Sequence, residues 1–474
     1  MKHSFAIAAV ALAVPALGHA EKPRVIVLSD IGNEPDDQMS LVRLLLYANE
    51  IDIEGLIATT STWQRTKASP EIMKSVIAAY GKVQPNLMLH AQGWPTQQAL
   101  DARVFSGQPQ YGMAATGPNK MSVGAQAIID AADRDDVRPL WIAVWGGANT
   151  LAQALAHVKE TRTPKALATL VSKLRVYSIS DQDDAGPWIR KEFPALFYIA
   201  KPSPPNSEEY ASATWTGISG DAYYRIPGAD TSLVTNTWLD KNIRSKGPLG
   251  AAYPRYMFIM EGDTPSFLGL IPNGLNAPET PNFGGWGGRY VLRQPYGETH
   301  ALWTQGGDMF RRVTSADTVG DVTSDQATIW RWRTAYQNDF AARMDWTIRD
   351  FAHANHPPVV TVKGAYQLTL KAGETRNLDA SGSKDPDGNT LNYRWFHYAE
   401  AGAGSGNLAE IRLNLSVGAR VSVTALNVCR KAWIDGYIPC KGSGTAHLIL
   451  AVTDNGTPAL TRYARIILTV EPKT

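Results

Sequence analysis

The sequence predicts two domains: an α/β domain with a mostly parallel open sheet and helices on both faces, followed by an all-β sandwich. Two observations support this. Up to residue 351, short apolar runs alternate with segments of helical periodicity, which is typical of a parallel sheet covered by helices. Beyond residue 358, short β-branched runs are separated by turns rich in Gly, Pro, Asn and Asp, which is typical of a sandwich.

The elements of the α/β domain follow from this alternation. The first apolar run is suited to a strand buried on both faces. The expected strands are Arg24–Ser29, Ile53–Thr59, Leu140–Trp145, Leu174–Ser180 and Tyr256–Met260. The expected helices are Gln38–Asn49, one beginning at the Ser-Pro-Glu of residues 69–71, Val123–Ala132, Asn149–Val158 and Asp325–Phe351.

The C-terminal part has the periodicity of short strands. These expected strands are Val359–Val362, Tyr366–Leu370, Leu391–Phe396, His447–Thr453 and Tyr463–Val470. Residues 379–388, together with Tyr393-Arg-Trp395, resemble immunoglobulin-like modules of the PKD and cadherin kind. In that segment Asp385 and Asp387 are suited either to a structural calcium ion or simply to starting a turn.

The ends and the composition of the chain set the domain limits. Residues 1–20 have the short basic start, apolar run and small residues of a cleaved signal peptide, although a retained anchor is the alternative. We therefore expect a periplasmic or secreted protein, with domains at residues 21–352 and 359–474 and a linker at residues 353–358. No later stretch predicts membrane insertion, and the oligomeric state stays unknown.

Charge and cysteine content narrow the class of protein further. The 46 basic and 44 acidic side chains give a net charge of +2, so the chain has no basic field to attract nucleic acid. The two cysteines, Cys429 and Cys440, are suited to a local disulfide in an oxidising compartment, and unbridged thiols are the alternative.

Acidic residues gather where the first expected strand ends. Asp30 closes that strand, and Asp36 and Asp37 lie at the start of the following helix. Open α/β sheets bind ligands at the carboxyl ends of their strands, and clustered carboxylates repel one another unless a cation joins them. Calcium accepts such irregular oxygen ligands, and it lowers the pKa of a bound water. The alternative is a solvated acidic loop that caps the helix.

Several motifs resemble those of calcium-dependent nucleoside hydrolases. The resemblance covers residues 25–30 with Asp36-Asp37, residues 53–60 and residues 141–150. The chain is still more similar to the nucleoside-hydrolase-like domain of bacterial proteins described as cellulose-binding, which carry a C-terminal β-sandwich. The motifs for that resemblance are residues 30–38, 177–186, 261–266 and 284–289.

The resemblance implies roles for individual residues. Asp30 would be a calcium ligand and the base that takes the proton of the water, and Asp37 would be a second, bidentate ligand. Asp36, the other residue that we expect to be catalytic, would accept hydrogen bonds from sugar hydroxyl groups. Trp145 would offer its backbone carbonyl to the ion. Asp263 would be the late ligand, with Glu261 as the reserve.

Further residues are expected to bind the substrate. Gln182, Asp183 and Asp184 follow another strand, and so should lie on the same rim and pair with sugar hydroxyl groups. Asn149 belongs to the resembling segment at residues 141–150. Trp63 and Trp286 lie in loops where a flat ring would stack on a sugar, although core packing is the default for any tryptophan. Asp36 and Glu261 are also expected to bind the substrate, which completes this set.

Two departures from true nucleoside hydrolases bear on the substrate. The loop from Asp30 to Asp36 is longer than theirs, so Glu34 could join the ion site. No histidine stands beside Asp263 to protonate a leaving base; Glu261, Asp183 or Asp184 would have to protonate a sugar. We therefore expect an exported hydrolase that cleaves a plant or algal glycan fragment with a calcium-bound water. The alternatives are a non-catalytic carbohydrate-binding (cellulose-binding) protein and a periplasmic nucleoside hydrolase.

Overall fold

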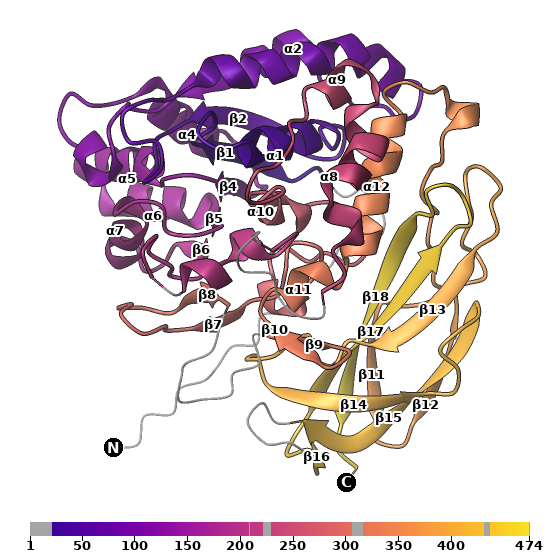
Figure 1. Ribbon diagram of the computed structural model, residues 1–474. Coiled ribbons are helices and arrows are strands. Elements are labelled where there is room, and N and C mark those ends of the chain that lie inside the picture. The colour runs from indigo at the N-terminus through magenta and orange to yellow at the C-terminus, as the bar shows by residue number, and fades with distance from the viewer. Residues whose placement is uncertain (1–20, 208, 221–228, 306–315, 431–436, 474) are drawn as a thin grey trace, which may run out of the picture.

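The computed structural model describes residues 21–207, 209–220, 229–305, 316–430 and 437–473 (Figure 1). The expected signal peptide, residues 1–20, lies outside the described residues. Within the described part of the chain, no helix has the length and apolar character needed to cross a membrane.

One eight-stranded sheet forms the centre of the N-terminal domain. Its order is β3-β2-β1-β4-β5-β6-β8-β7, and every neighbouring pair is parallel except β7 with β8. The strands are β1 Arg24–Ser29, β2 Asp52–Ala58, β3 Val104–Ser106, β4 Leu140–Val144, β5 Leu174–Ser178, β6 Phe197–Ile199, β7 Val291–Arg293 and β8 Leu302–Thr304. The parallel strands bring their carboxyl ends to one edge, as the predicted fold class requires.

Helices cover both faces of this sheet because successive residues of each strand point to opposite sides. In β1, Val25 and Val27 belong to one apolar core and Ile26 and Leu28 to another. The first core includes residues of α1 Asp36–Leu45, α2 Pro70–Leu87, α10 Pro265–Leu268 and α12 Arg333–Asp345. The second includes residues of α4 Val123–Asp133, α5 Asn149–Thr161, α6 Pro164–Lys173 and α7 Ala185–Glu192. The remaining helices are short: α3 Gln97–Asp101, α8 Asn236–Leu239, α9 Gly247–Ala251 and α11 Ala327–Trp330.

Three predicted elements are wrong. Residues 256–260 form no strand, because Met257 and Phe258 are exposed at the surface instead of being buried in the sheet. The helix expected over residues 325–351 is broken into α11 and α12 near Trp332, which packs against aromatic rings of the sandwich. Residues 359–362 form no strand either, and only Val359 makes a bridge, to Lys384.

The C-terminal domain is all β, as predicted. Its strands are β11 Gln367–Lys371, β12 Thr375–Asp379, β13 Asn392–His397, β14 Asn407–Leu413, β15 Arg420–Arg430, β16 Tyr437–Ile438, β17 Gly444–Thr453 and β18 Thr461–Glu471. They enclose a core around Trp395, and Cys429 and Cys440 form a disulfide. Asp385 Oδ1 accepts hydrogen bonds from the N–H groups of Asp387 and Asn389, as the turn alternative predicts. Its Oδ2 atom has no partner among the described residues, so a structural calcium ion there stays a prediction. A separate hairpin, β9 Asp317–Val319 with β10 Val322–Ser324, lies between the domains in Figure 1.

The two domains share a large buried interface. Trp286 and Trp332 of the α/β domain contact the ring of Tyr463 on β18 edge-on. Arg465, on the same strand, donates hydrogen bonds to the carbonyl oxygens of Leu275, Phe283 and Gly284. In the expected linker, His356 is buried and bonded to Asp387. The sandwich is therefore packed firmly against the α/β domain.

Candidate functional site

A cavity of about 310 Å³ opens at the carboxyl ends of the parallel strands. Its walls come from the loops after β1, β2, β4, β5 and β6 and from the segment that precedes α10. The residues lining it are Asp30, Asn33, Glu34, Asp36, Asp37, Trp63, Trp145, Ile179, Gln182, Pro205, Tyr210, Trp215, Phe258, Ile259 and Asp263. The topology thus brings residues far apart in sequence to one edge of the sheet, as expected for this fold class.

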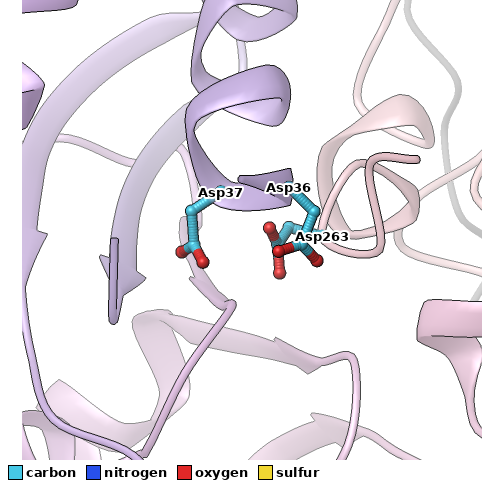
Figure 2. Close-up of side chains that lie close together, drawn as sticks. All are labelled: Asp36, Asp37 and Asp263. Carbon is cyan, nitrogen blue, oxygen red and sulfur yellow. The ribbon is translucent and has the colours of Figure 1, made fainter. Parts of the chain in front are cut away.

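Three carboxylates meet at this cavity. Asp36 and Asp37 project from the first turn of α1, and Asp263 projects from the loop beside it (Figure 2). One oxygen from each lies within 4.8 Å of those of the other two. Asp263 is 1% exposed, and its Oδ2 atom has no hydrogen-bond partner in the described part of the chain. An unpartnered buried oxygen beside two further carboxylates fits a bound cation.

Asp30 lies next to this group and is held by neighbouring loops. Its Oδ2 atom accepts a hydrogen bond from the Ser61 hydroxyl group, and Ser29 donates in the same way to Asp37 Oδ1. Gly146 is needed beside Asp30, because a Cβ atom there would lie 2.6 Å from Asp30 Oδ1. Gly262 is needed in the same way, because its Cβ atom would lie 2.9 Å from Asp36 Oδ2.

Burial and crowding raise the pKa values of all four aspartates. Loss of hydration is the largest cause in each case. It raises the pKa of Asp30 to about 6, and with repulsion from Glu34 and Asp30 it raises the pKa of Asp36 to about 8. Burial and repulsion from the other aspartates raise the pKa of Asp37 and of Asp263 well above the usual range. A solvated acidic loop, the alternative that the sequence left open, does not fit these buried side chains.

Trp145 and Gln182 form another wall of the cavity. The Trp145 indole donates a hydrogen bond of 2.8 Å to Ser266 Oγ, which ties β4 to α10. The Trp145 carbonyl accepts a hydrogen bond of 2.7 Å from Gln182 Nε2, while Gln182 Oε1 is buried without a partner among the described residues. Two oxygen atoms that a ligand could use therefore lie in this wall.

Glu261 lies outside the cavity and does not fit its predicted roles. Its carboxylate is fully buried, forms an ion pair of 2.5 Å with Arg43 and accepts hydrogen bonds from Tyr253 and Thr264. Both of its carboxylate oxygen atoms are thus bonded to other residues of the protein, and neither is left to accept a hydrogen bond from a substrate. Asp263, and not Glu261, is the acid of this motif that faces the cavity.

Four other predicted substrate-binding residues also lie away from the cavity wall. Asp183 accepts hydrogen bonds from the backbone N–H groups of Asn149, Ala185 and Gly186, which fastens the loop after β5 to two helices. Asp184 accepts from the N–H group of Met113. The Asn149 side chain is fully buried and bonded to Thr59, Thr60 and Gln110.

Trp286 is the fourth of these residues. It is 0% exposed and packs between Tyr336 and Tyr463 at the domain interface, where no sugar could stack on it. The core-packing alternative is therefore correct for Trp286, whereas Trp63 is half exposed at the cavity.

The sequence analysis missed the aromatic residues that complete the cavity. Tyr210 and Trp215 come from the irregular segment after β6, and Phe258 comes from the segment wrongly expected to be a strand. The segment with Tyr210 and Trp215 has neither helical nor strand periodicity, and the apolar run around Phe258 resembles a buried strand, so no local pattern placed these rings over the sheet edge. The aromatic content of these loops was the only available signal.

Comparison with known proteins gives matches over both domains. The family model described as cellulose-binding Sde182, nucleoside hydrolase-like domain, matches residues 24–290. The model described as cellulose-binding protein Sde0182, C-terminal domain, matches residues 375–470. Among curated proteins, none matches this chain.

Solved structures are also similar. A nucleoside hydrolase-related hypothetical protein from Saccharophagus degradans, described as associated with carbohydrate metabolism, is 38% identical. That match covers 95% of this chain and 100% of the other, with a TM-score of 0.77. The effector protein XOO4466 (13% identical) and the type III effector protein XopQ, solved with adenosine diphosphate ribose (11% identical), each match 70% of this chain and 96% of their own length. Their TM-scores of 0.33 are too low to inform function.

The first family model spans more than half of the chain, and the similar structure from Saccharophagus degradans extends across both domains. The chain therefore belongs to the family of cellulose-binding proteins with a nucleoside hydrolase-like domain.

Proposed function

We propose that this protein hydrolyses a glycosidic bond in a fragment of a plant or algal glycan, with a calcium ion held by the aspartate cluster. The observation that carries the proposal is the meeting of Asp30, Asp36, Asp37 and Asp263 at one cavity. Keeping four buried carboxylates charged without a cation costs free energy. Groups with such strongly raised pKa values occur mostly at functional sites.

The proposed ion ligands are Asp30, Asp37 and Asp263, with the Trp145 carbonyl as a further oxygen. The unpartnered Oδ2 atom of Asp263 supports this set. Bound calcium would supply positive charge that makes a neighbouring water molecule more acidic. The aspartate carboxylates would in turn stabilise the positive charge that develops on a sugar ring during glycosidic cleavage.

Asp30 is our candidate for the base. Ser61 fixes its carboxyl group on one side, so its other oxygen atom keeps a defined position in the cavity. Asp36 is the candidate that binds sugar hydroxyl groups. Glu34 also lines the cavity and adds a carboxyl group from the lengthened loop after β1, where it is suited to bonding a sugar hydroxyl group.

Non-catalytic binding of cellulose is the second candidate function, favoured by the descriptions of both matching family models. A nucleoside substrate is less well supported. None of the described residues that line the cavity is a histidine, so a purine or pyrimidine leaving group would lack the acid that the resemblance associates with it.

Export to the periplasm or the medium is also part of the proposal. The disulfide between Cys429 and Cys440 supports it, because such bonds persist in oxidising compartments.

The variant Asp30→Asn tests catalysis separately from binding. We expect it to abolish the release of reducing sugar from a panel of plant and algal glycans, while retention on cellulose is unchanged. If the wild type releases no sugar from any member of the panel, the protein is a binder. If it instead frees bases from inosine or uridine at ordinary enzyme rates, it is a nucleoside hydrolase.

A further inference from the structure

The indole of Trp63 stands at the mouth of the cavity in a fixed orientation. It is 46% exposed, whereas the four aspartates are between 1% and 8% exposed, so the ring lies outside the carboxylates. Its Nε1 atom donates a hydrogen bond of 3.1 Å to the Tyr210 hydroxyl group. Since this N–H is the only polar group of the indole, the exposed part of the ring offers an apolar surface.

Other aromatic rings support Trp63 from behind. The Tyr210 ring lies 6.1 Å from that of Trp63 and 5.1 Å from that of Trp215, between centroids. The Trp215 indole donates a hydrogen bond of 2.8 Å to the Tyr210 carbonyl and is only 8% exposed. Phe258, which is 40% exposed, adds apolar surface to the same cavity. We call Trp63, Tyr210, Trp215 and Phe258 the aromatic platform.

The position of the platform relative to Asp30 is set by one serine. Ser61 Oγ donates to Asp30 and accepts a hydrogen bond of 2.9 Å from the backbone N–H of Trp63. Gln64 reinforces this link, because its Nε2 atom donates to the Asp30 carbonyl at 3.0 Å. A ring so closely tied to a buried acid holds one part of a ligand in register with another part inside the cavity.

Charge limits what the platform can hold. The cavity below it contains Glu34 and four aspartates, and one calcium ion would balance only two of these carboxylates, so a chain that carries carboxylate or sulfate groups would still be repelled. A β-1,4-linked glucan is uncharged and ribbon-like, with flat C–H faces that match an exposed indole.

Among its described residues, the sandwich has no aromatic side chain as exposed as Trp63, and Tyr366, Tyr393 and Phe396 are half-buried. Its exposed large apolar side chains, within residues 359–430 and 438–473, are Val359, Leu415 and Val417, all aliphatic. Its rings at Trp395, Tyr398 and Tyr463 are buried, the last two against the α/β domain.

We propose that the aromatic platform is a second sugar subsite, which binds a β-1,4-glucan chain outside the aspartate cluster and makes the α/β domain, not the sandwich, the cellulose-binding surface. The inference rests on the proposed function, since it assigns the substrate class of the same site. It implies that the ligand is an oligosaccharide long enough to reach from the aspartates to Trp63.

Calorimetric titration with cellotetraose tests this proposal. All proteins carry Asp30→Asn so that no ligand is consumed. We expect Trp63→Ala to weaken binding by about tenfold or more, as for truncation of a central aromatic anchor. Tyr210→Phe should weaken it less, because the ring stays but the bond that orients Trp63 is lost. Tetragalacturonate, which is anionic, should bind at least tenfold more weakly than cellotetraose.

Tyr296→Ala is the matched control. Tyr296 is fully exposed, but it lies in the turn before β8, which is parallel to β6, and hence at the opposite edge of the sheet. It should bind cellotetraose as the parent does. The proposal is overturned if the parent does not bind cellotetraose, if Trp63→Ala binds as tightly as the parent, or if tetragalacturonate binds equally well.

Sugar release by proteins with Asp30 intact is measured separately. If cellotetraose does not bind through Trp63 but the wild type hydrolyses small glycosides, the proposed function stands and only binding at the platform is refuted. If cellotetraose binds through Trp63 but the wild type releases no sugar, binding at the platform stands and the proposed hydrolysis is refuted.

Discussion

Ser61 donates a hydrogen bond to the carboxylate of Asp30, and the same hydroxyl oxygen accepts the backbone N–H of Trp63. One side chain therefore supports both an expected calcium ligand and the ring at the cavity mouth. Residues that orient metal ligands in this way usually affect metal affinity strongly, although they do not touch the ion.

The first prediction concerns this hydrogen bond. Ser61→Ala should weaken calcium binding by about 10-fold to 100-fold, because Asp30 loses the donor that orients it and lowers its pKa. Calcium titration followed by calorimetry measures the change. Ser75→Ala, which removes only an exposed hydroxyl bonded to its own helix, serves as the control. Equal affinities in the two variants would show that Ser61 does not support the site.

The second prediction concerns repulsion within the cluster. Asp263→Asn should abolish calcium binding yet make the calcium-free protein more stable at pH 8, by about 1 kcal/mol or more. The reason is that an uncharged amide removes one of the charges that crowd Asp36 and Asp37. Thermal unfolding with and without calcium measures both effects. A less stable calcium-free variant would mean that Asp263 is needed for packing and not for an ion.

The third prediction is a pH dependence. In the unfolded chain the aspartates lose their protons near pH 4, whereas burial holds the pKa of Asp30 at about 6 and that of Asp36 at about 8. The protonated forms of Asp30 and Asp36 therefore contribute fully to stability below pH 4, and this contribution is lost as pH rises toward 8. Calcium replaces these protons, so the rise in Tm that it causes should be larger at pH 8 than at pH 5. An equal rise at both values would contradict ion binding by these groups.

The fourth prediction concerns the domain interface. Arg465→Leu should reduce the free energy of unfolding by about 3 kcal/mol, because three carbonyl groups at the domain interface, two of them in buried hydrogen bonds, lose their donor. Denaturant unfolding measures it. Arg420→Leu, at an exposed ion pair with Asp379, should cost less than about 1 kcal/mol. Similar losses in both variants would show that Arg465 does not hold the domains together.

The order of strands and helices in the α/β domain was predictable because the spacing of apolar residues along the chain shows which faces of each element are buried. The runs at residues 24–29 and 140–144 are apolar throughout, since both of their faces meet helices. The same rule failed at residues 256–260, where an apolar run lies at the cavity mouth and not in the sheet. Strands β12 and β14 were missed because polar and charged residues interrupt their apolar positions. Strand β15 was missed although Val421, Val423 and Ala425 give it the regular alternation of a strand.

The candidate site shows a similar division. Asp30, Asp36 and Asp37 could be predicted to lie together because they occupy the loop and the first helical turn after one strand, which a short stretch of sequence shows. Glu261 and Asp263 are equally acidic and two residues apart, yet one faces Arg43 and the other the cavity. That choice depends on the left-handed backbone of Glu261, at φ 56°, and on an arginine far away in the sequence. Neither of these is visible in a single motif.

The central claim is that the aspartate cluster holds a calcium ion. The most direct measurement is an anomalous difference map from crystals of the protein grown with calcium. We expect a peak about 2.3–2.6 Å from carboxylate oxygens of Asp37 and Asp263, with Asp30 completing the group. A map without a peak, in which these carboxyl groups bond only to one another or to water, would contradict the account.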